Sequence, residues 1–258
     1  GGADFSAPRL VLAAGGAAYP SLGSTGALFP VLERLGHSVR PLRPALAPLV
    51  AEMRPYQKLQ GLRLDARTRV LRGTETLGET YGNLIFTQWG LNGPAVMDLS
   101  HLVSARPEED LTLSLDLLAG QTGALRELAQ SARKSELPLR VLLQSALAPK
   151  AAQFFLDEAR LKGETALRSV PENALQKLLA RLGDVRFELR GVRSFEYCQV
   201  AAGGVPLEEV EAATMQSRRV PGLFLAGETL DMVGPCGGYN LQFAFSSGAA
   251  AGLAAGLW

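Results

Sequence analysis

Two short apolar runs, one near each end of the chain, dominate the hydrophobic pattern. Within residues 9–14 (RLVLAA) and 222–226 (GLFLA), the runs LVLAA and LFLA are continuously apolar, and each is followed by glycine, which is typical of buried parallel strands. The second run leads into a glycine-rich loop at 234–238 and then an unbroken small and apolar segment at 239–252. The pattern predicts strand, glycine loop and buried helix across 220–252. Such a layout presents backbone N–H groups at a helix N-terminus to polar or anionic ligand groups.

The middle of the chain changes character twice. Residues 45–118 contain short apolar runs separated by glycine turns, and the alternation in 65–73 (DARTRVLRG) indicates a strand with one solvated face. This region is predicted to form a small β-barrel or a β-sandwich. In residues 119–185, leucine and phenylalanine recur at helical spacing and prolines stand near segment starts, which predicts three or four short helices.

These patterns predict a mixed α/β and α+β chain in which one domain interrupts another. The three prolines of residues 40–50 indicate an extended connector that leaves the first domain. We therefore expect residues 1–40 and 193–258 to form one α/β domain, in which the two apolar strands share a sheet. Residues 41–192 are expected to form the inserted domain.

Composition excludes several classes of protein. The 258 residues are 47% hydrophobic and 20% charged, as in ordinary globular proteins, and the net charge of +1 favours no strongly basic nucleic-acid surface. The two cysteines, Cys198 and Cys236, make neither a disulfide framework nor a zinc motif, which favours a reducing cytoplasm. The longest apolar stretch, 241–257, is interrupted by polar residues and is too short to span a bilayer, so no membrane partner is expected.

The sequence contains no familiar catalytic or metal-binding motif. It lacks the GxGxxG fingerprint of a dinucleotide-binding turn and the GxSxG elbow of a serine hydrolase. Its two histidines, His37 and His101, are isolated, and we interpret them as surface or capping residues rather than members of a triad. No metal site is predicted, because two histidines and scattered acids do not make a ligand set.

Candidate functional residues gather in the region 220–252. Asp231, beyond the end of a predicted strand, suits either a turn or acceptance of a hydrogen bond from a ligand hydroxyl. Glu228 is a candidate partner for a buried arginine, and Asn240 a candidate helix N-cap. Cys236 is either a reactive thiol near a helix N-terminus or an inert small residue.

Five stretches of the sequence together carry a family resemblance. They are Leu10–Gly16 with the following AAYPSLGSTG, LGHSVRPLRPALAPL (35–49), IFTQWGLNGPAVMDLS (85–100), VAAGGVPLEEV (200–210) and SRRVPGLFLAGETLDMVGPCGGYNLQFAFSSGAAAG (217–252). These stretches resemble the BaiN/RdsA-type bacterial FAD-dependent oxidoreductases, and the last is the most specific. The resemblance implies a glutathione-reductase-like FAD-binding domain, partial in this chain, interrupted by a β-barrel and helical insert.

The resemblance also implies which residues meet the cofactor. Asp231 would meet the ribityl chain of FAD, and GGYNLQ would place a helix N-terminus against the pyrimidine end of the flavin, where reduced flavin carries negative charge. The implied cofactor-binding positions are Gly15, Gly16, Gly227, Asp231, Gly237, Gly238, Tyr239, Asn240 and Leu241.

Three departures from the family pattern shape the expected activity. Gln88 stands where the family has a histidine suited to acid–base chemistry, so no catalytic residue is assigned. Cys236 stands where threonine is commonest. The family's N-terminal GxGxxG strand–turn–helix has no counterpart in this sequence, so we expect the chain to bind FAD poorly unless a separate or missing N-terminal segment complements it.

The implied function is that of the C-terminal portion of an FAD-dependent oxidoreductase. Flavin would pass hydride from a donor such as NAD(P)H to an unsaturated organic substrate, either a small molecule or a nucleobase in RNA. Candidate RNA contacts, for which a solvated face is the simpler interpretation, are Arg63, Arg67, Arg69 and Arg72. The alternative is a non-catalytic binding or scaffold module that has lost its cofactor-binding half.

Overall fold

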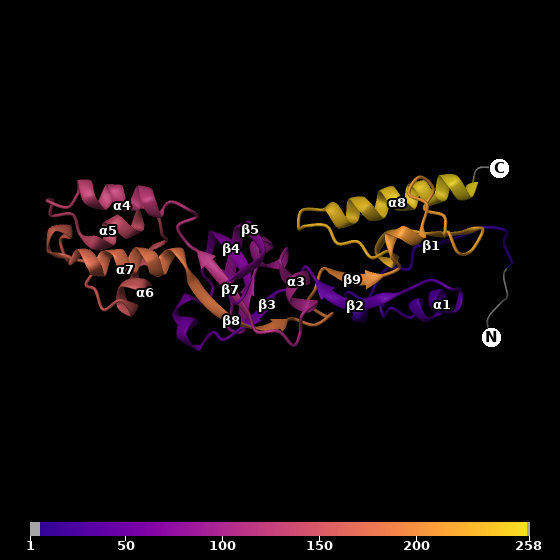
Figure 1. Cartoon of the computed structure of the whole chain (residues 1–258), viewed down its shortest axis with the longest axis horizontal. Coiled ribbons are helices and arrows are strands. Elements are labelled where there is room, and N and C mark those ends of the chain that lie inside the picture. The colour runs from indigo at the N-terminus through magenta and orange to yellow at the C-terminus, as the bar shows by residue number, and fades with distance from the viewer. Residues whose placement is uncertain (1–5, 257–258) are drawn as a thin grey trace. The chain divides into compact units, whose positions relative to one another are not determined.

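The computed structural model describes residues 6–256, so the first five and last two residues of the predicted α/β domain lie outside it. The described chain forms two compact units (Figure 1). Unit 1 combines the segment that ends at Ala47 with the segment that begins at Arg193. Unit 2 is the continuous stretch Pro48–Val192.

A parallel pair of strands lies at the centre of unit 1. β1 (Leu10–Leu12) pairs with β10 (Leu223–Leu225) in the register Leu10 to Leu223, which confirms that the two apolar runs share a sheet. Helix α8 (Tyr239–Gly256) packs against one face of this pair, where Phe224 and Ala226 meet Ala251. Since successive strand residues point to opposite faces, Leu223 and Leu225 point to the other side.

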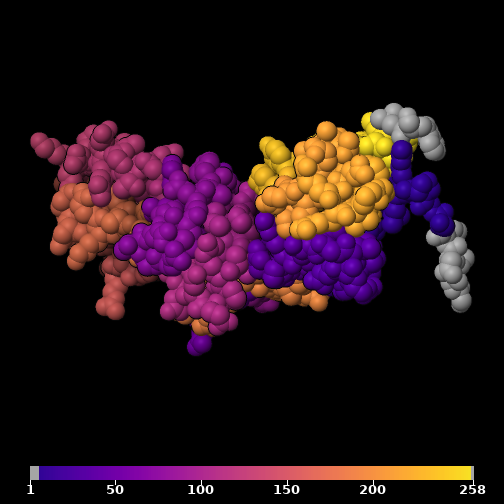
Figure 2. All heavy atoms as spheres, turned by 45° about the vertical axis from the view of Figure 1, so that its right-hand side comes forward, coloured from indigo at the N-terminus to yellow at the C-terminus, as the bar shows by residue number. Residues whose placement is uncertain are grey.

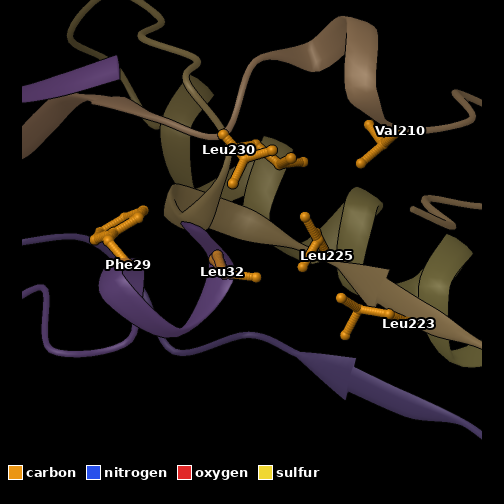
Figure 3. Close-up of a cluster of buried hydrophobic side chains, with 7 residues drawn as sticks. Phe29, Leu32, Val210, Leu223, Leu225 and Leu230 are labelled. Carbon is orange, nitrogen blue, oxygen red and sulfur yellow. The ribbon is translucent and has the colours of Figure 1, made fainter. Parts of the chain in front are cut away.

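The main apolar cluster of unit 1 fills that other side (Figure 3). Phe29 and Leu32 reach it from helix α1 (Phe29–Arg34) and pack against the side chains of β10. The buried members of the cluster are Phe29, Leu32, Val205, Val210, Leu223, Leu225 and Leu230. The short sheet is therefore held between α8 and this cluster.

A second two-stranded sheet in unit 1 corrects the predicted connector. β2 (Arg40–Ala45) pairs antiparallel with β9 (Val200–Gly204), so most of the proline-rich segment is strand rather than linker. The pairing is interrupted between Arg40 and Arg43, around Pro41. Proline is tolerated here because β2 pairs with β9 on one side only. On its other side there is no strand to which the missing proline N–H would have to donate.

Unit 2 contains a closed six-stranded barrel, which confirms the barrel prediction and rules out the sandwich. Around the barrel the strands follow the order β3 (Leu49–Ala51), β6 (Gly90–Asn92), β5 (Glu75–Phe86), β4 (Arg63–Arg72), β7 (Leu111–Asp116), β8 (Val185–Val192). The last strand lies far beyond the predicted barrel region. It pairs with both β7 and β3, and it thereby closes two edges that would otherwise be exposed.

Helices fill the sequence between the barrel strands. Two short ones, α2 (Pro94–Met97) and α3 (Ser100–Ser104), follow β6. Three or four helices were predicted between β7 and β8, and four α-helices are present there: α4 (Thr122–Ser131), α5 (Leu139–Gln144), α6 (Pro149–Glu158) and α7 (Glu172–Gly183). Their buried positions are mostly leucine, in keeping with the helical spacing seen in the sequence.

Two elements predicted to be buried are exposed in the described structure. Leu10 and Val11 of β1 are 55% and 36% exposed, because β1 pairs on one edge only. Helix α8 is apolar on every side, yet only Ser247 and Ala251 are buried. Among the described helices, none combines the length and the apolar character that a membrane span requires.

Candidate functional site

A cavity of about 310 Å³ lies at the start of α8 in unit 1. Its walls come from the residues leading into β9, from the turn after β10, and from the glycine loop with the first turns of α8. The lining residues are Leu46, Gln199, Val200, Glu228, Met232, Pro235, Cys236, Gly237, Gly238, Asn240, Leu241, Phe243 and Ala244. Four of the predicted cofactor-binding residues are thereby brought together: Gly237, Gly238, Asn240 and Leu241.

Asn240 holds the glycine loop in a fixed shape. Its Oδ1 accepts a hydrogen bond from the Gly234 N–H at 2.8 Å, and its Nδ2 donates to the Gly234 carbonyl at 2.9 Å. The predicted N-cap residue is thus a clamp across six residues. Gly237 and Gly238 have φ values of +119° and +92°, which only glycine adopts without strain. A Cβ on Gly238 would meet nothing within 4 Å, so the backbone there is open to a ligand.

Glu228 is the carboxyl group of this cavity. It lies in a 3₁₀ turn (Gly227–Thr229) directly after β10, and its Oε1 accepts a hydrogen bond from the Ala201 N–H of β9 at 2.9 Å. No arginine partner of Glu228 is found among the described residues, contrary to prediction. Gly227 begins the turn with φ +65° and donates its N–H to Ser247 Oγ at 2.9 Å, which ties the turn to α8.

Burial raises the pKa of the Glu228 carboxyl above its ordinary value, and the Ala201 hydrogen bond opposes this only in part. Glu228 is therefore protonated more readily in the folded state than in the unfolded chain. Sequence reasoning treated Glu228 as a structural residue. The sequence did offer one signal for a role at the site: Glu228 follows Gly227, directly after the predicted strand that ends at Ala226.

We expect Glu228→Gln to stabilise the protein at neutral pH relative to the wild type. Because the pKa of Glu228 is higher in the folded state than in the unfolded chain, ionising this carboxyl lowers the free energy of unfolding. The contribution of Glu228 to stability is therefore complete below its ordinary pKa and is lost as the pH rises through the folded-state pKa. Glutamine mimics the protonated form, so the advantage of the variant is expected to vanish in acid. Thermal unfolding of both proteins across the acid-to-neutral range measures this, and an advantage independent of pH would contradict it.

A second, smaller cavity of about 120 Å³ contains the other predicted glycine pair, Gly15 and Gly16, together with Thr229. The hydroxyl of Thr229 is buried and has no hydrogen-bond partner within the described part of the chain. The Gly16 carbonyl is fixed by Ser24 Oγ at 3.0 Å. A Cβ on Gly16 would lie 2.3 Å from Glu228 Oε1. The absence of a side chain at Gly16 therefore lets the Glu228 carboxyl pack against the loop that follows β1.

Neither Asp231 nor Tyr239 is among the described residues that line the two cavities, although the Tyr239 ring lies beside Gly237. Asp231 Oδ1 accepts the Gly203 N–H at 2.8 Å, and Oδ2 pairs with Arg40 at 2.8 Å, which ties the β2–β9 sheet to the turn after β10. Of the described residues that line the two cavities, none is Asp231. Tyr239, at the start of α8, is 60% exposed.

The cysteines differ in their surroundings. Cys236 lines the larger cavity and is partly exposed. Cys198 is buried, and burial raises the pKa of its thiol to about 11, which keeps it protonated and unreactive at neutral pH. Within residues 6–256, no group of His, Cys, Asp and Glu is suited to hold a metal ion.

Two of the four candidate arginines of β4, Arg67 and Arg72, form ion pairs with carboxylates of unit 2. Arg67 pairs with Glu79 at 2.8 Å, and Arg72 pairs with both Glu75 and Glu109 at 2.9 and 3.3 Å. Arg69 donates to Ser114 Oγ. This arrangement favours a solvated, charge-balanced face over a basic stripe.

His37 is buried, so its interpretation as a surface or capping residue is wrong. Its Nδ1 lies 2.7 Å from Glu209 Oε2, and its Nε2 lies 2.8 Å from Ser217 Oγ. The connectivity is that of a Ser-His-Glu triad. However, the Ser217 oxygen already accepts the N–H groups of Arg219 and Val220 at 3.0 and 2.9 Å, and all three triad residues are less than 10% exposed. The group therefore stabilises the chain between β9 and β10.

This network makes unit 1 sensitive to acid. Burial raises the pKa of Glu209, but hydrogen bonds from Ser38, His37 and Arg219 outweigh it and hold the pKa at about 2, below the ordinary 4.5. The resulting stability is complete above pH 4.5 and is lost as the pH falls through about 2. We expect the free energy of unfolding to fall by on the order of 2 kcal/mol across this interval.

Urea unfolding at a series of acid pH values measures the effect. Glu209→Gln is expected to flatten the dependence. Glu211→Gln, which removes an exposed carboxylate paired with Arg218, is the matched control and should leave it intact. Identical acid profiles for the wild type and Glu209→Gln would contradict this assignment.

Comparison with known proteins identifies the family. The model of the HI0933-like protein Rossmann domain matches residues 1–254. The chain is 31% identical over 259 residues to a 3-dehydro-bile acid delta(4,6)-reductase of Clostridium scindens, a match that covers 98% of the chain and 63% of that protein.

Two further relatives are ribosomal RNA dihydrouridine synthases. Those of Escherichia coli and Haemophilus influenzae are each 29% identical, over 95% and 97% of the chain and 60% and 61% of their own lengths. The chain thus spans about three fifths of these relatives. The chain therefore belongs to the HI0933-like protein Rossmann domain family, the group of BaiN/RdsA-type proteins that its motifs resemble.

Proposed function

We propose that this chain forms the flavin-holding part of an FAD-dependent oxidoreductase. One observation carries the proposal: the cavity at the N-terminus of α8 combines bare glycine backbone, a helix N-terminus and the partly buried carboxyl of Glu228. Membership in the HI0933-like family supports it.

The residues present fit the flavin end of FAD. At Gly238 a Cβ would meet nothing within 4 Å, so a planar ring can approach the backbone there. The first N–H groups of α8, an 18-residue helix, supply a partial positive charge at the same place. Leu46, Val200 and Phe243 add apolar walls, which suit an aromatic ring.

When bound, FAD would supply the hydride chemistry. The chain's own part is electrostatic and positional. The N-terminus of α8 stabilises negative charge that develops beside it, because its dipole and unpaired N–H groups are already oriented. Glu228 places a carboxyl group at the cavity wall, and the Asn240 clamp fixes the loop beside it.

The substrate that we propose is an unsaturated organic ring, with NAD(P)H as the electron donor. The names of the relatives, a bile acid reductase and two ribosomal RNA dihydrouridine synthases, support reduction as the reaction class. The paired arginines of β4 favour a small molecule over RNA for that surface.

The test is the flavin absorbance spectrum of the purified chain, alone and titrated with FAD. We expect weak binding by the chain alone and stoichiometric binding once the rest of the cofactor site is supplied. A complemented protein that fails to bind FAD would overturn the proposal. The same outcome would favour a non-catalytic binding module.

A further inference from the structure

A cavity of about 380 Å³ lies in the helical part of unit 2. The described residues that line it come from α6, from α7 and from the three positions that follow α6. Atoms of this part of the chain, in pink to coral tones, lie at the surface in Figure 2. The cavity shares no lining residue with the proposed flavin cavity of unit 1, so it is a separate feature of the molecule.

Most of the cavity wall is apolar. Phe155 and Leu178 are 0% and 2% exposed and form its buried part, whereas Ala159, Leu161 and Ala174 are more accessible. Ala174 lies one turn before Leu178 on the same side of α7, and its small side chain leaves space there. Apolar walls with a small number of polar groups are typical of sites for small molecules.

Three charged residues complete the lining, and their charges do not cancel. Arg181 Nη2 lies 3.1 Å from Glu158 Oε1 and also donates to the Tyr56 hydroxyl at 2.9 Å. Lys177 lines the same cavity, but it makes neither an ion pair nor a hydrogen bond with the described residues. Two cations and one carboxylate leave a net charge of +1 at the cavity, and Lys177 carries it.

The helix ends do not account for Lys177. A cation in the last turn of a helix offsets the partial negative charge of that end, and Arg181 does so in α7 by donating to the Asp184 carbonyl. Lys177 lies six residues before Gly183, where α7 ends, and the dipole effect is confined to the last turn. At the end of α6, the N–H groups of residues 159–161 satisfy three of the last four carbonyls.

We propose that this cavity binds a small amphipathic carboxylate, whose apolar chain lies along α6 and α7 and whose carboxylate pairs with Lys177. At about 30 Å³ for each water-sized group, the cavity holds about a dozen non-hydrogen atoms, which is the size of decanoate. A peptide would exceed this space, so a small molecule is the better match. The site does not depend on the proposed function, because its residues all belong to unit 2.

The test titrates the 258-residue chain with decanoate, below the concentration at which decanoate forms micelles. Calorimetry measures affinity, and amide NMR locates the site. We expect saturable one-to-one binding with shifts centred on α6 and α7. Decanol lacks the charge and acetate lacks the apolar chain, so each is expected to bind at least about tenfold more weakly.

Two variants separate the charge from the apolar walls. Lys177→Glu is expected to weaken decanoate binding about tenfold or more, because repulsion replaces attraction. Lys134→Glu changes the net charge equally at another exposed lysine of unit 2, and it should leave the affinity unchanged. Ala174→Leu places a larger side chain in the cavity and is expected to abolish binding while the thermal unfolding of the chain stays cooperative.

Several results would overturn the site. They are the absence of saturable binding, shifts that lie outside α6 and α7, and equal losses in Lys177→Glu and Lys134→Glu. Equal affinities for decanol and decanoate would show that Lys177 plays no part in recognition. A short apolar peptide with a free C-terminal carboxylate is titrated as well. Binding of this peptide without binding of decanoate would assign the cavity to a protein partner and overturn the small-molecule site.

Discussion

Gly203→Ala is expected to lower the free energy of unfolding of unit 1 by about 4 kcal/mol. Gly203 lies in β9 with φ +96°, and a Cβ there would lie 2.3 Å from the Pro41 carbonyl oxygen and 2.8 Å from that of Arg40. Both are backbone atoms of β2, so the clash cannot be relieved by turning a side chain. The strand pair must separate, and the Gly203 N–H would lose its bond to Asp231.

Gly36→Ala separates the two causes of this loss. Gly36 has a similar φ of +91°, but a Cβ on it would meet nothing within 4 Å. It should therefore cost only the backbone strain, about 1–2 kcal/mol. Urea unfolding followed by circular dichroism compares the two variants. Equal losses would show that the close approach of β2 and β9 adds nothing to stability.

Asn240→Ala is expected to weaken FAD binding by about 10- to 100-fold in the complemented protein. The variant removes both hydrogen bonds to Gly234, at 2.8 and 2.9 Å, which together are worth about 1–3 kcal/mol. The glycine loop would then have to be ordered on binding, at the expense of affinity. Flavin fluorescence titration measures the change. Faster amide exchange at Gly237 and Gly238 is the accompanying sign that the loop has loosened.

Two further variants make the result specific to the loop. Asn240→Asp keeps the acceptor for the Gly234 N–H and loses the donor, so an intermediate affinity is expected. Asn92→Ala removes another asparagine that fixes a glycine, Gly93, in the barrel of unit 2, and should leave FAD affinity unchanged. An Asn240→Ala protein with wild-type affinity and wild-type exchange would disprove the clamp.

The sequence predicted the structure correctly where the local composition of a single segment was sufficient to identify the element. Leu10–Leu12 and Leu223–Leu225 are continuous apolar runs, and both are strands of one parallel pair. The glycine loop and the helix after it also followed from local composition, because glycine permits φ values that other residues avoid. Four of the residues named for the cofactor, Gly237, Gly238, Asn240 and Leu241, line one cavity because they lie within five consecutive positions of this loop and helix.

Contacts between distant segments could not be predicted in this way. Asp231 binds Arg40 across 191 residues, and His37 meets Glu209 across 172. The residues next to Asp231 and Glu209 in the sequence do not indicate whether each carboxylate binds a distant side chain or water. The arginine expected beside Glu228 lies instead beside Asp231, and the carboxyl that lines the cavity is Glu228.

The sequence by itself determined the strands, the glycine loop, the apolar helix and the family, since each depends on residues that are close together along the chain. Only the tertiary structure decided that β8 closes the barrel, that the proline-rich segment pairs as β2, and that α8 is exposed. The hydrophobicity of a segment indicates that its burial is favourable, but it does not indicate which other element will cover it. That choice depends on three-dimensional neighbours, which within the described residues leave only Ser247 and Ala251 of α8 buried.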